Sequence, residues 1–170
     1  PEGWSKDKAK IAIGVKDDLN TGNFEIVKTE AKNGQNGSWQ DITEEMFIEV
    51  TENCSVYVQV TDQNNKVYSK NKSINCFDKT NPTLNAAVSN GLLTVVGYDS
   101  QSGIKAFYVN GYEFKEFTNN TLNVRLQQFD TGYEYFTVQA MDNSGNMSEV
   151  YKTKNPYYDD DKSDDDDKGA

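Results

Sequence analysis

The sequence predicts an all-β protein made of two antiparallel β-sandwiches in series. Apolar and polar residues alternate along most of the chain, which is the period of a half-buried strand. Turn-forming Gly and Asn residues interrupt this alternation at intervals of about 8–12 residues, as they do in sandwiches. Residues 136–142 (FTVQAMD) repeat the pattern of residues 56–62 (VYVQVTD), and each segment ends in Asp before a short polar loop. A repeat of this size indicates two copies of one domain.

The repeat sets the expected domain boundaries. We expect a lead-in at residues 1–8, a first domain at 9–78, a linker at 79–83, a second domain at 84–157 and an acidic tail at 158–170. Domains this small have a modest core and are often stabilised by a crosslink. The tail is rich in Asp and cannot bury apolar surface, so we expect it to be disordered.

In the first domain, alternation predicts strands at residues 9–15, 24–30 and 46–50, and in the two arms of a hairpin at 54–77. Trp39 follows a Gly- and Asn-rich loop and is expected to be the large core side chain of this domain.

The hairpin carries the only two cysteines of the chain, Cys54 and Cys76. If it turns about Asn64 and Asn65, the two cysteines face each other at a Cα separation that allows a disulfide. We therefore expect a Cys54–Cys76 disulfide, which fits an oxidising compartment. A pair of reduced, buried thiols is the alternative. Metal binding by two Cys without any His is not expected.

In the second domain, strands are expected at residues 84–88, 93–95, 104–108 and 122–126, and in a second hairpin that ends near residue 154. Asn110 and Gly111 predict a tight hairpin turn, because both residues tolerate positive φ. Tyr108 is expected in the core.

Three nearby aromatic residues are candidates for a surface that binds sugar or peptide: Phe107, Tyr112 and Phe114. About half of the aromatic residues on alternating strands must face inward, so core packing is the competing role for each of them.

Five acidic residues fall in expected loops: Asp62, Asp78, Asp99, Asp130 and Asp142. Acids near a domain junction can bind Ca²⁺, which takes six to eight oxygen ligands, but none of these loops has EF-hand spacing. Asp at the start of a turn commonly accepts hydrogen bonds from its own turn backbone. We expect this turn role, and neither a metal nor another cofactor.

Composition excludes several classes of function. The net charge of −10 argues against a nucleic-acid-binding protein, which needs a basic surface. No apolar run is long enough to span a membrane. The chain has no His, and no Ser or Cys motif places a nucleophile beside a base, so we expect no enzymatic activity.

Several loops resemble a known class of domain. Residues 77–83 (FDKTNPT), 99–104 (DSQSGI) and 142–146 (DNSGN) resemble tandem bacterial Ig-like domains of Gram-positive surface proteins. The loop at residues 62–66 (DQNNK) departs from this pattern because it lacks the Gly.

A narrower resemblance covers about residues 8–158. Residues 109–114 (VNGYEF), 125–130 (RLQQFD) and 155–158 (NPYY) resemble a surface protein family encoded on mobile conjugative elements of gut Firmicutes.

The resemblance implies export, attachment to the cell envelope through regions outside this chain, and a role in adhesion or contact between cells. It supplies no catalytic residues. We therefore expect a monomeric, non-enzymatic, extracellular module whose partner is a protein or glycan on another surface. The alternatives are a structural spacer in a larger surface protein and an accessory carbohydrate-binding module.

Overall fold

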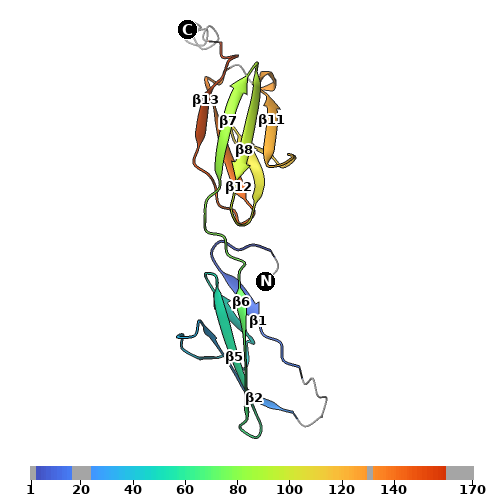
Figure 1. Ribbon diagram of the computed structural model, residues 1–170, viewed down its shortest axis with the longest axis vertical. Coiled ribbons are helices and arrows are strands. Elements are labelled where there is room, and N and C mark those ends of the chain that lie inside the picture. The colour runs from blue at the N-terminus through green and yellow to red at the C-terminus, as the bar shows by residue number, and fades with distance from the viewer. Residues whose placement is uncertain (1–2, 17–23, 130–131, 160–170) are drawn as a thin grey trace, which may run out of the picture. The chain divides into compact units, whose positions relative to one another are not determined.

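The computed structural model describes residues 3–16, 24–129 and 132–159. Within these residues it holds strands β1 to β13 and one short 3-10 helix, η1 (Leu126–Gln128). Neighbouring strands are antiparallel in every sheet, which confirms the predicted all-β class. The chain divides into two compact units, Pro1–Asp78 and Lys79–Ala170 (Figure 1). The predicted acidic tail lies outside the described residues from residue 160 onward.

Unit 1 contains two sheets. The smaller pairs β1 (Ala9–Ala12) with β4 (Phe47–Val50). The larger has the order β3 (Gln40–Asp41), β2 (Ile26–Asn33), β5 (Cys54–Asp62), β6 (Val67–Ile74). Inward side chains of both sheets form one core: Ala9, Ala31, Ile42, Ile48, Val50, Val56, Ile74 and Phe77.

Unit 2 also contains two sheets. One has the order β11 (Thr121–Arg125), β8 (Leu92–Tyr98), β7 (Thr83–Ser89). The other has the order β10 (Tyr112–Phe114), β9 (Ile104–Val109), β12 (Tyr135–Asp142), β13 (Tyr151–Lys154). Its core is larger than that of unit 1 and includes the fully buried rings of Phe107 and Phe136.

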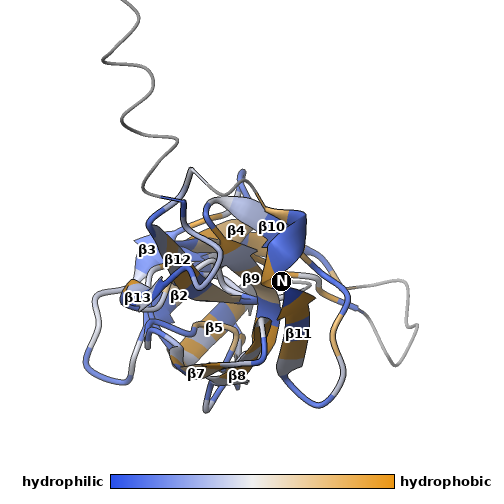
Figure 2. Cartoon of the chain, turned by 90° about the horizontal axis from the view of Figure 1, so that it is seen from above, coloured by the Kyte–Doolittle hydropathy of each residue, from blue (hydrophilic) through white to orange (hydrophobic). Residues whose placement is uncertain are grey.

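The sequence repeat corresponds to a repeated place in the fold. Residues 56–62 lie in β5 and residues 136–142 in β12, and each strand is third in its four-stranded sheet. Hydropathy alternates along the strands in both units (Figure 2). The predicted turn at Asn110 and Gly111 joins β9 to β10, with φ of 49° and 80° at the two residues.

Trp39 is not the core residue that the sequence predicts for the first domain. Its side chain is 37% exposed, and the Nζ of Lys32 lies 4.6 Å from its ring centroid in a cation–π contact. Trp39 directly precedes β3, a two-residue strand at the edge of its sheet, so little of the sheet covers it. Phe77 is the large buried ring of unit 1 instead.

The hairpin of β5 and β6 has a different register from the predicted one. Cys54 pairs with Ile74 rather than with Cys76, and Val60 pairs with Tyr68. The Oδ1 of Asp62 accepts hydrogen bonds from the backbone N of Asn64 and of Lys66, which closes the turn one residue earlier than expected. Moving a turn centre by one residue moves every cross-strand partner by two.

Candidate functional site

The two cysteines lie at the edge of the unit 1 core. Both are free thiols in the structure and both are half-buried against the core. Burial raises the pKa of the Cys54 thiol above its ordinary value, and the nearby Glu52 carboxylate and Cys76 thiol add to the rise. Cys54 is therefore protonated at neutral pH and is a poor nucleophile. Cys76 lies two residues beyond Ile74, the partner of Cys54.

Two of the loop acids hold equivalent turns in the two units. Asp62 accepts from two turn amides at 2.8 and 2.9 Å, and Asp142 accepts from the amides of Ser144 and Asn146 at 2.9 and 2.8 Å. Asp142 is fully buried, and its second oxygen accepts from the Nδ2 of Asn146 at 2.9 Å. The expectation that these acids cap their own turns is confirmed for both.

The remaining loop acids differ in setting. Asp99 caps its own loop, because its Oδ2 accepts from the backbone N of Gly103 at 2.8 Å and of Gln101 at 3.3 Å. Asp78 is fully buried, and its backbone N donates to the carbonyl oxygen of Ser5 at 3.2 Å. Asp130 lies outside the described residues.

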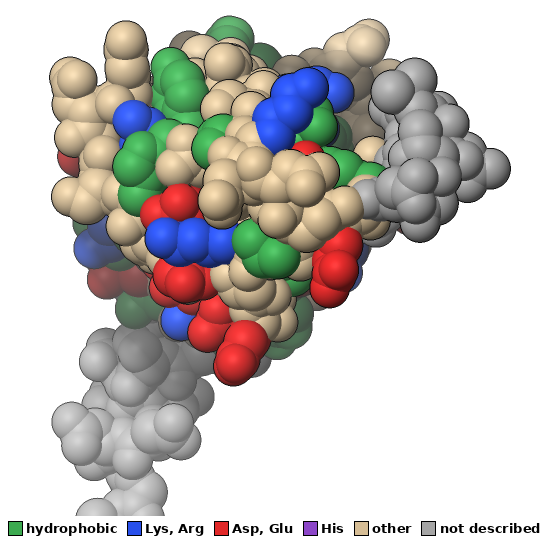
Figure 3. Space-filling model, turned by 90° about the horizontal axis from the view of Figure 1, so that it is seen from below, with side chains coloured by type: hydrophobic (Ala, Val, Ile, Leu, Met, Phe, Trp, Pro, Cys, Tyr) green, Lys and Arg blue, Asp and Glu red, His purple; other side chains and the backbone are tan. Residues whose placement is uncertain are grey.

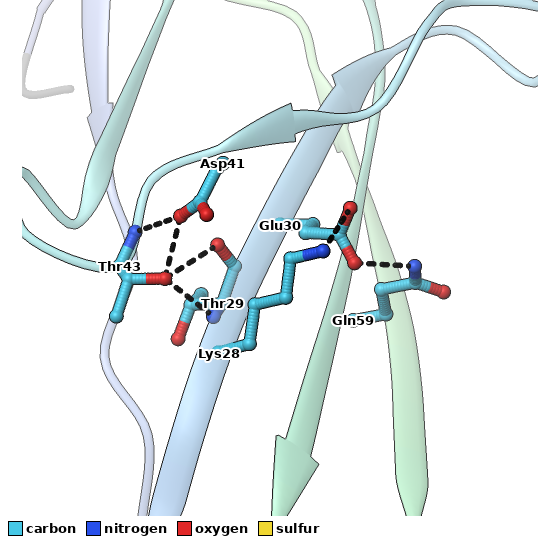
Figure 4. A network of polar contacts seen from close by, with 6 residues as sticks. All are labelled: Lys28, Thr29, Glu30, Asp41, Thr43 and Gln59. Carbon is cyan, nitrogen blue, oxygen red and sulfur yellow. Dashed lines mark hydrogen bonds and ion pairs between the residues drawn. The ribbon is translucent and has the colours of Figure 1, made fainter.

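A polar network joins β3 to β2 (Figure 4). Asp41 accepts from the hydroxyl of Thr43 at 2.6 Å and from its backbone N at 3.0 Å, while the Oγ1 of Thr43 accepts from the backbone N of buried Thr29 at 3.1 Å. These bonds to Thr43 hold the pKa of Asp41 below its ordinary value. The network fastens the edge strand and places no nucleophile beside a base.

A second set of polar contacts starts from the same strand, β2. Glu30 pairs with Lys28 at 3.5 Å and accepts from the amide of Gln59 at 3.0 Å. This pair of contacts links β2 to β5 and is structural in character.

The structure separates the three candidate aromatic residues. Phe107 is fully buried and packs edge-on against Phe117 with ring centroids 5.0 Å apart, so it does not face a ligand. Phe114 is half-buried and packs against the same core. Tyr112 is 58% exposed and alone among the three presents its ring to solvent.

Tyr108 is not a core residue, contrary to the prediction. The pairing of β9 with β12 shifts between Met141 and Asp142, so the side-chain alternation of β9 changes phase. Phe107 and Val109 consequently face the core. The hydroxyl of Tyr108 donates to the Oε2 of Glu113 at 2.8 Å on the outer face. This bond lowers the pKa of Glu113. The pKa of Tyr108 is raised, mainly because burial removes its hydroxyl from water and secondly because of the bond to the Glu113 carboxylate.

Tyr112 belongs to an aromatic cluster that the sequence did not reveal. Its ring lies 5.8 Å from that of Phe129, which lies 5.3 Å from that of Phe136. Tyr133 also contacts Phe136, at 6.4 Å. Phe136 is fully buried, whereas Tyr112 and Tyr133 are 58% and 43% exposed. We call Tyr112, Phe129 and Tyr133 the aromatic cluster. Its members are too far apart in sequence for a local pattern to indicate them.

The surface shows no single sign of charge on the face drawn in Figure 3. Basic, acidic and hydrophobic side chains are interspersed there. The part of the chain that the structure describes contains no helix that could span a membrane.

No protein-family model and no curated protein matches the chain. Among solved structures, it is similar to the fibronectin(III)-like modules of Clostridium thermocellum CbhA, with 14% identity, a TM-score of 0.47, and coverage of 89% of this chain and 86% of that one. It is also similar to SGBP-B of a Bacteroides ovatus mixed-linkage glucan utilization locus, solved with a mixed-linkage heptasaccharide. That match has 13% identity, a TM-score of 0.31, and coverage of 90% of this chain and 42% of that one.

Proposed function

We propose that the chain is a non-enzymatic, extracellular Ig-like module of a bacterial surface protein that acts in adhesion or contact between cells. The observation that supports a binding role is the aromatic cluster of unit 2, where Tyr112 and Tyr133 are 58% and 43% exposed. The module would be anchored to the envelope through regions outside residues 1–170, and its partner would be a protein or glycan on another surface.

The cluster has the physical properties of a binding anchor. Exposed Tyr rings supply large contact areas with few rotatable bonds, and tyrosines are enriched among residues that dominate binding energy. Both rings rest on others that are already packed, since Tyr112 contacts Phe129 and Tyr133 contacts buried Phe136. Little side-chain entropy is then lost on binding.

Each exposed ring is tilted against the ring that supports it, Tyr112 by 58° against Phe129 and Tyr133 by 43° against Phe136. The structural spacer is the first alternative to a binding role, and the accessory carbohydrate-binding module is the second.

The engaged carboxylates favour a non-enzymatic role. Asp62, Asp99 and Asp142 are committed to turn amides, and Asp41 to Thr43. With no His in the chain, these acids have no imidazole base as a partner.

Binding of the fluorescently labelled chain to intact Gram-positive cells tests the proposal by flow cytometry. The doubly substituted Tyr112→Ala, Tyr133→Ala protein should bind about tenfold or more weakly, because each anchor contributes about 1 kcal/mol or more. Tyr98→Ala is the control, since Tyr98 is 52% exposed in the other sheet of unit 2. Failure of the unsubstituted chain to bind any cells would support the spacer. Competition by soluble mixed-linkage glucan would support the carbohydrate-binding module.

A further inference from the structure

Among the described residues, the smaller sheet of unit 1 has one strand fewer than that of unit 2. β1 pairs with β4 just as β8 pairs with β11, and β4 and β11 are each the last strand before the repeated strand of their unit. β8 has a second neighbour, β7, on its other edge. Within the described residues, β1 has no strand at that edge.

A groove lies where the additional strand would be. It has a volume of about 590 Å³. One wall is the chain from Ile11 to Lys16, the floor is Val56, Val58 and Val60 of β5, and the other wall is β6 from Tyr68 to Lys72. In unit 2 the corresponding space is filled, because β7 contacts β12 and β13, the counterparts of β5 and β6.

The backbone of β1 offers hydrogen-bonding groups to this groove. The N–H of Ile13 donates to the carbonyl oxygen of Met46 at 2.9 Å, so odd-numbered residues of this strand bond toward β4. Successive residues of an antiparallel strand direct their backbone groups to opposite edges. The N–H and C=O groups of Lys10, Ala12 and Gly14 therefore point to the free edge, where another strand could pair.

Among the described residues, the charged side chains that line the groove are all basic. They are Lys16, Lys70 and Lys72, and no described Asp or Glu lines it. This contrasts with the net charge of −10 for the chain. The lysines favour an acidic occupant over a neutral or basic one.

We propose that this groove binds an extended, acidic peptide segment of a protein partner, which adds to β1 as a third strand of the β4–β1 sheet. Main-chain hydrogen bonds to β1 would hold the segment, and alternate apolar side chains would lie on the valines of β5. This goes beyond the adhesive role assigned to the aromatic cluster, because it uses another unit and another kind of contact.

The structure of unit 2 gives the apolar spacing of the occupant. β7 places Leu84, Ala86 and Val88 against the core, with exposed Asn85 and Ala87 between them. A segment for unit 1 should carry medium-sized apolar residues at the same spacing of two. Its intervening residues face solvent and should be acidic, because their negative charge is attracted by the three lysines that line the groove.

Peptide binding to the full chain, followed by fluorescence anisotropy, tests the proposal. The probe PELEAEVEN keeps the apolar positions of residues 82–90 and places Glu between them, whereas PTLNAAVSN has the native residues. The acidic probe should bind more tightly than the native-sequence probe, and its affinity should fall with added salt. A scrambled acidic peptide should not bind.

Substitutions in the groove should weaken binding of the acidic probe selectively. Lys70→Glu with Lys72→Glu should lower its affinity about tenfold or more by replacing attraction with repulsion. Lys152→Glu with Lys154→Glu makes the same charge change on β13, the equivalent strand of unit 2, and should have no comparable effect. Ala12→Pro removes an N–H from the free edge and should also weaken binding, with the β1–β4 pairing checked by amide chemical shifts.

Three results would overturn the proposal. The first is equal binding of the scrambled and ordered acidic peptides. The second is absence of acidic-probe binding to the folded chain. The third is dimerisation of the chain alone in light scattering, abolished by Ala12→Pro, which would assign the groove to a second copy. The Tyr112→Ala, Tyr133→Ala variant should bind the acidic probe as tightly as the unsubstituted chain. Loss of cell binding in that variant therefore tests the adhesion proposal alone, and loss of probe binding in the groove variants tests the peptide proposal alone.

Discussion

At the scale of single residues, buried Asp142 is the most constrained acid of unit 2. It accepts three hydrogen bonds, two from turn amides and one from the Asn146 side chain. Asp142→Ala should lower the free energy of unfolding of unit 2 by about 2–3 kcal/mol, because it leaves buried donors without an acceptor. Urea unfolding monitored by fluorescence measures this. Glu149→Ala, at an exposed position, is the control and should change little.

Asp41 gives a prediction for pH dependence. Bonds to Thr43 lower its pKa in the folded state. A lowered folded pKa means that the carboxylate stabilises the fold above the unfolded pKa, and that this contribution is lost as pH falls through the folded pKa. Thr43→Val should therefore raise the pKa of Asp41 toward its ordinary value. NMR titration of the Asp41 carboxyl checks this, and an unchanged pKa would show that the Thr43 hydroxyl is not the cause.

At the scale of elements, the two faces of β9 should respond differently to substitution. Phe107 is fully buried, so Phe107→Ala should cost about 3–5 kcal/mol of stability. Tyr108→Phe removes only the hydroxyl bond to Glu113 on the outer face and should cost about 1 kcal/mol or less. Denaturant unfolding of both variants measures the difference. Equal losses of unfolding free energy in the two variants would contradict the observation that Phe107 faces the core and Tyr108 the outer face.

Period-two alternation predicted the existence of most strands but not the phase or register of two of them. The shift between Met141 and Asp142 depends on how two distant segments pair, and nothing local in β9 encodes it. The register of the β5–β6 hairpin depends on which turn amides Asp62 accepts from. Both are decided by hydrogen bonds that a hydropathy pattern does not contain.

The candidate site was predictable only in part, for a related reason. The stretch that contains Phe107, Tyr112 and Phe114 was identifiable as aromatic, and Tyr112 is indeed exposed. Phe129 contacts the Tyr112 ring, and Tyr133 joins the cluster through Phe136; the pairing of β9 with β10 and β12 brings these segments together. Trp39 shows the converse: its size suggests the core, but a short edge strand leaves it exposed beside Lys32.

At the scale of the whole molecule, the two units share a strand arrangement, but the smaller sheet of unit 1 has fewer described strands than that of unit 2. The repeat of residues 56–62 in residues 136–142 marks the same strand in each. Unit 2 has β7 beside β8, whereas β1 has a free edge among the described residues. Unit 1 also holds both cysteines of the chain. A covalent bond there would constrain the unit that has fewer strands.

We predict that oxidation links Cys54 to Cys76 and stabilises unit 1 alone. The thiols are free in the structure, and their interaction contributes to the raised pKa of Cys54. Because Cys76 lies beyond the end of β6, it can move toward Cys54 without breaking the paired part of the hairpin. On the chain-entropy estimate, a loop of this length adds roughly 3 kcal/mol.

Calorimetry of the air-oxidised and reduced chain separates this effect by unit. Reduction should lower the temperature of one unfolding transition and leave the other nearly unchanged, because both cysteines belong to unit 1. Phe107→Ala identifies the transition of unit 2, since its ring is buried in that core alone. Intact mass under non-reducing conditions establishes whether the bond is present. Free alkylation of both thiols in the folded, air-oxidised protein would show that the strand end does not move enough for the bond to form.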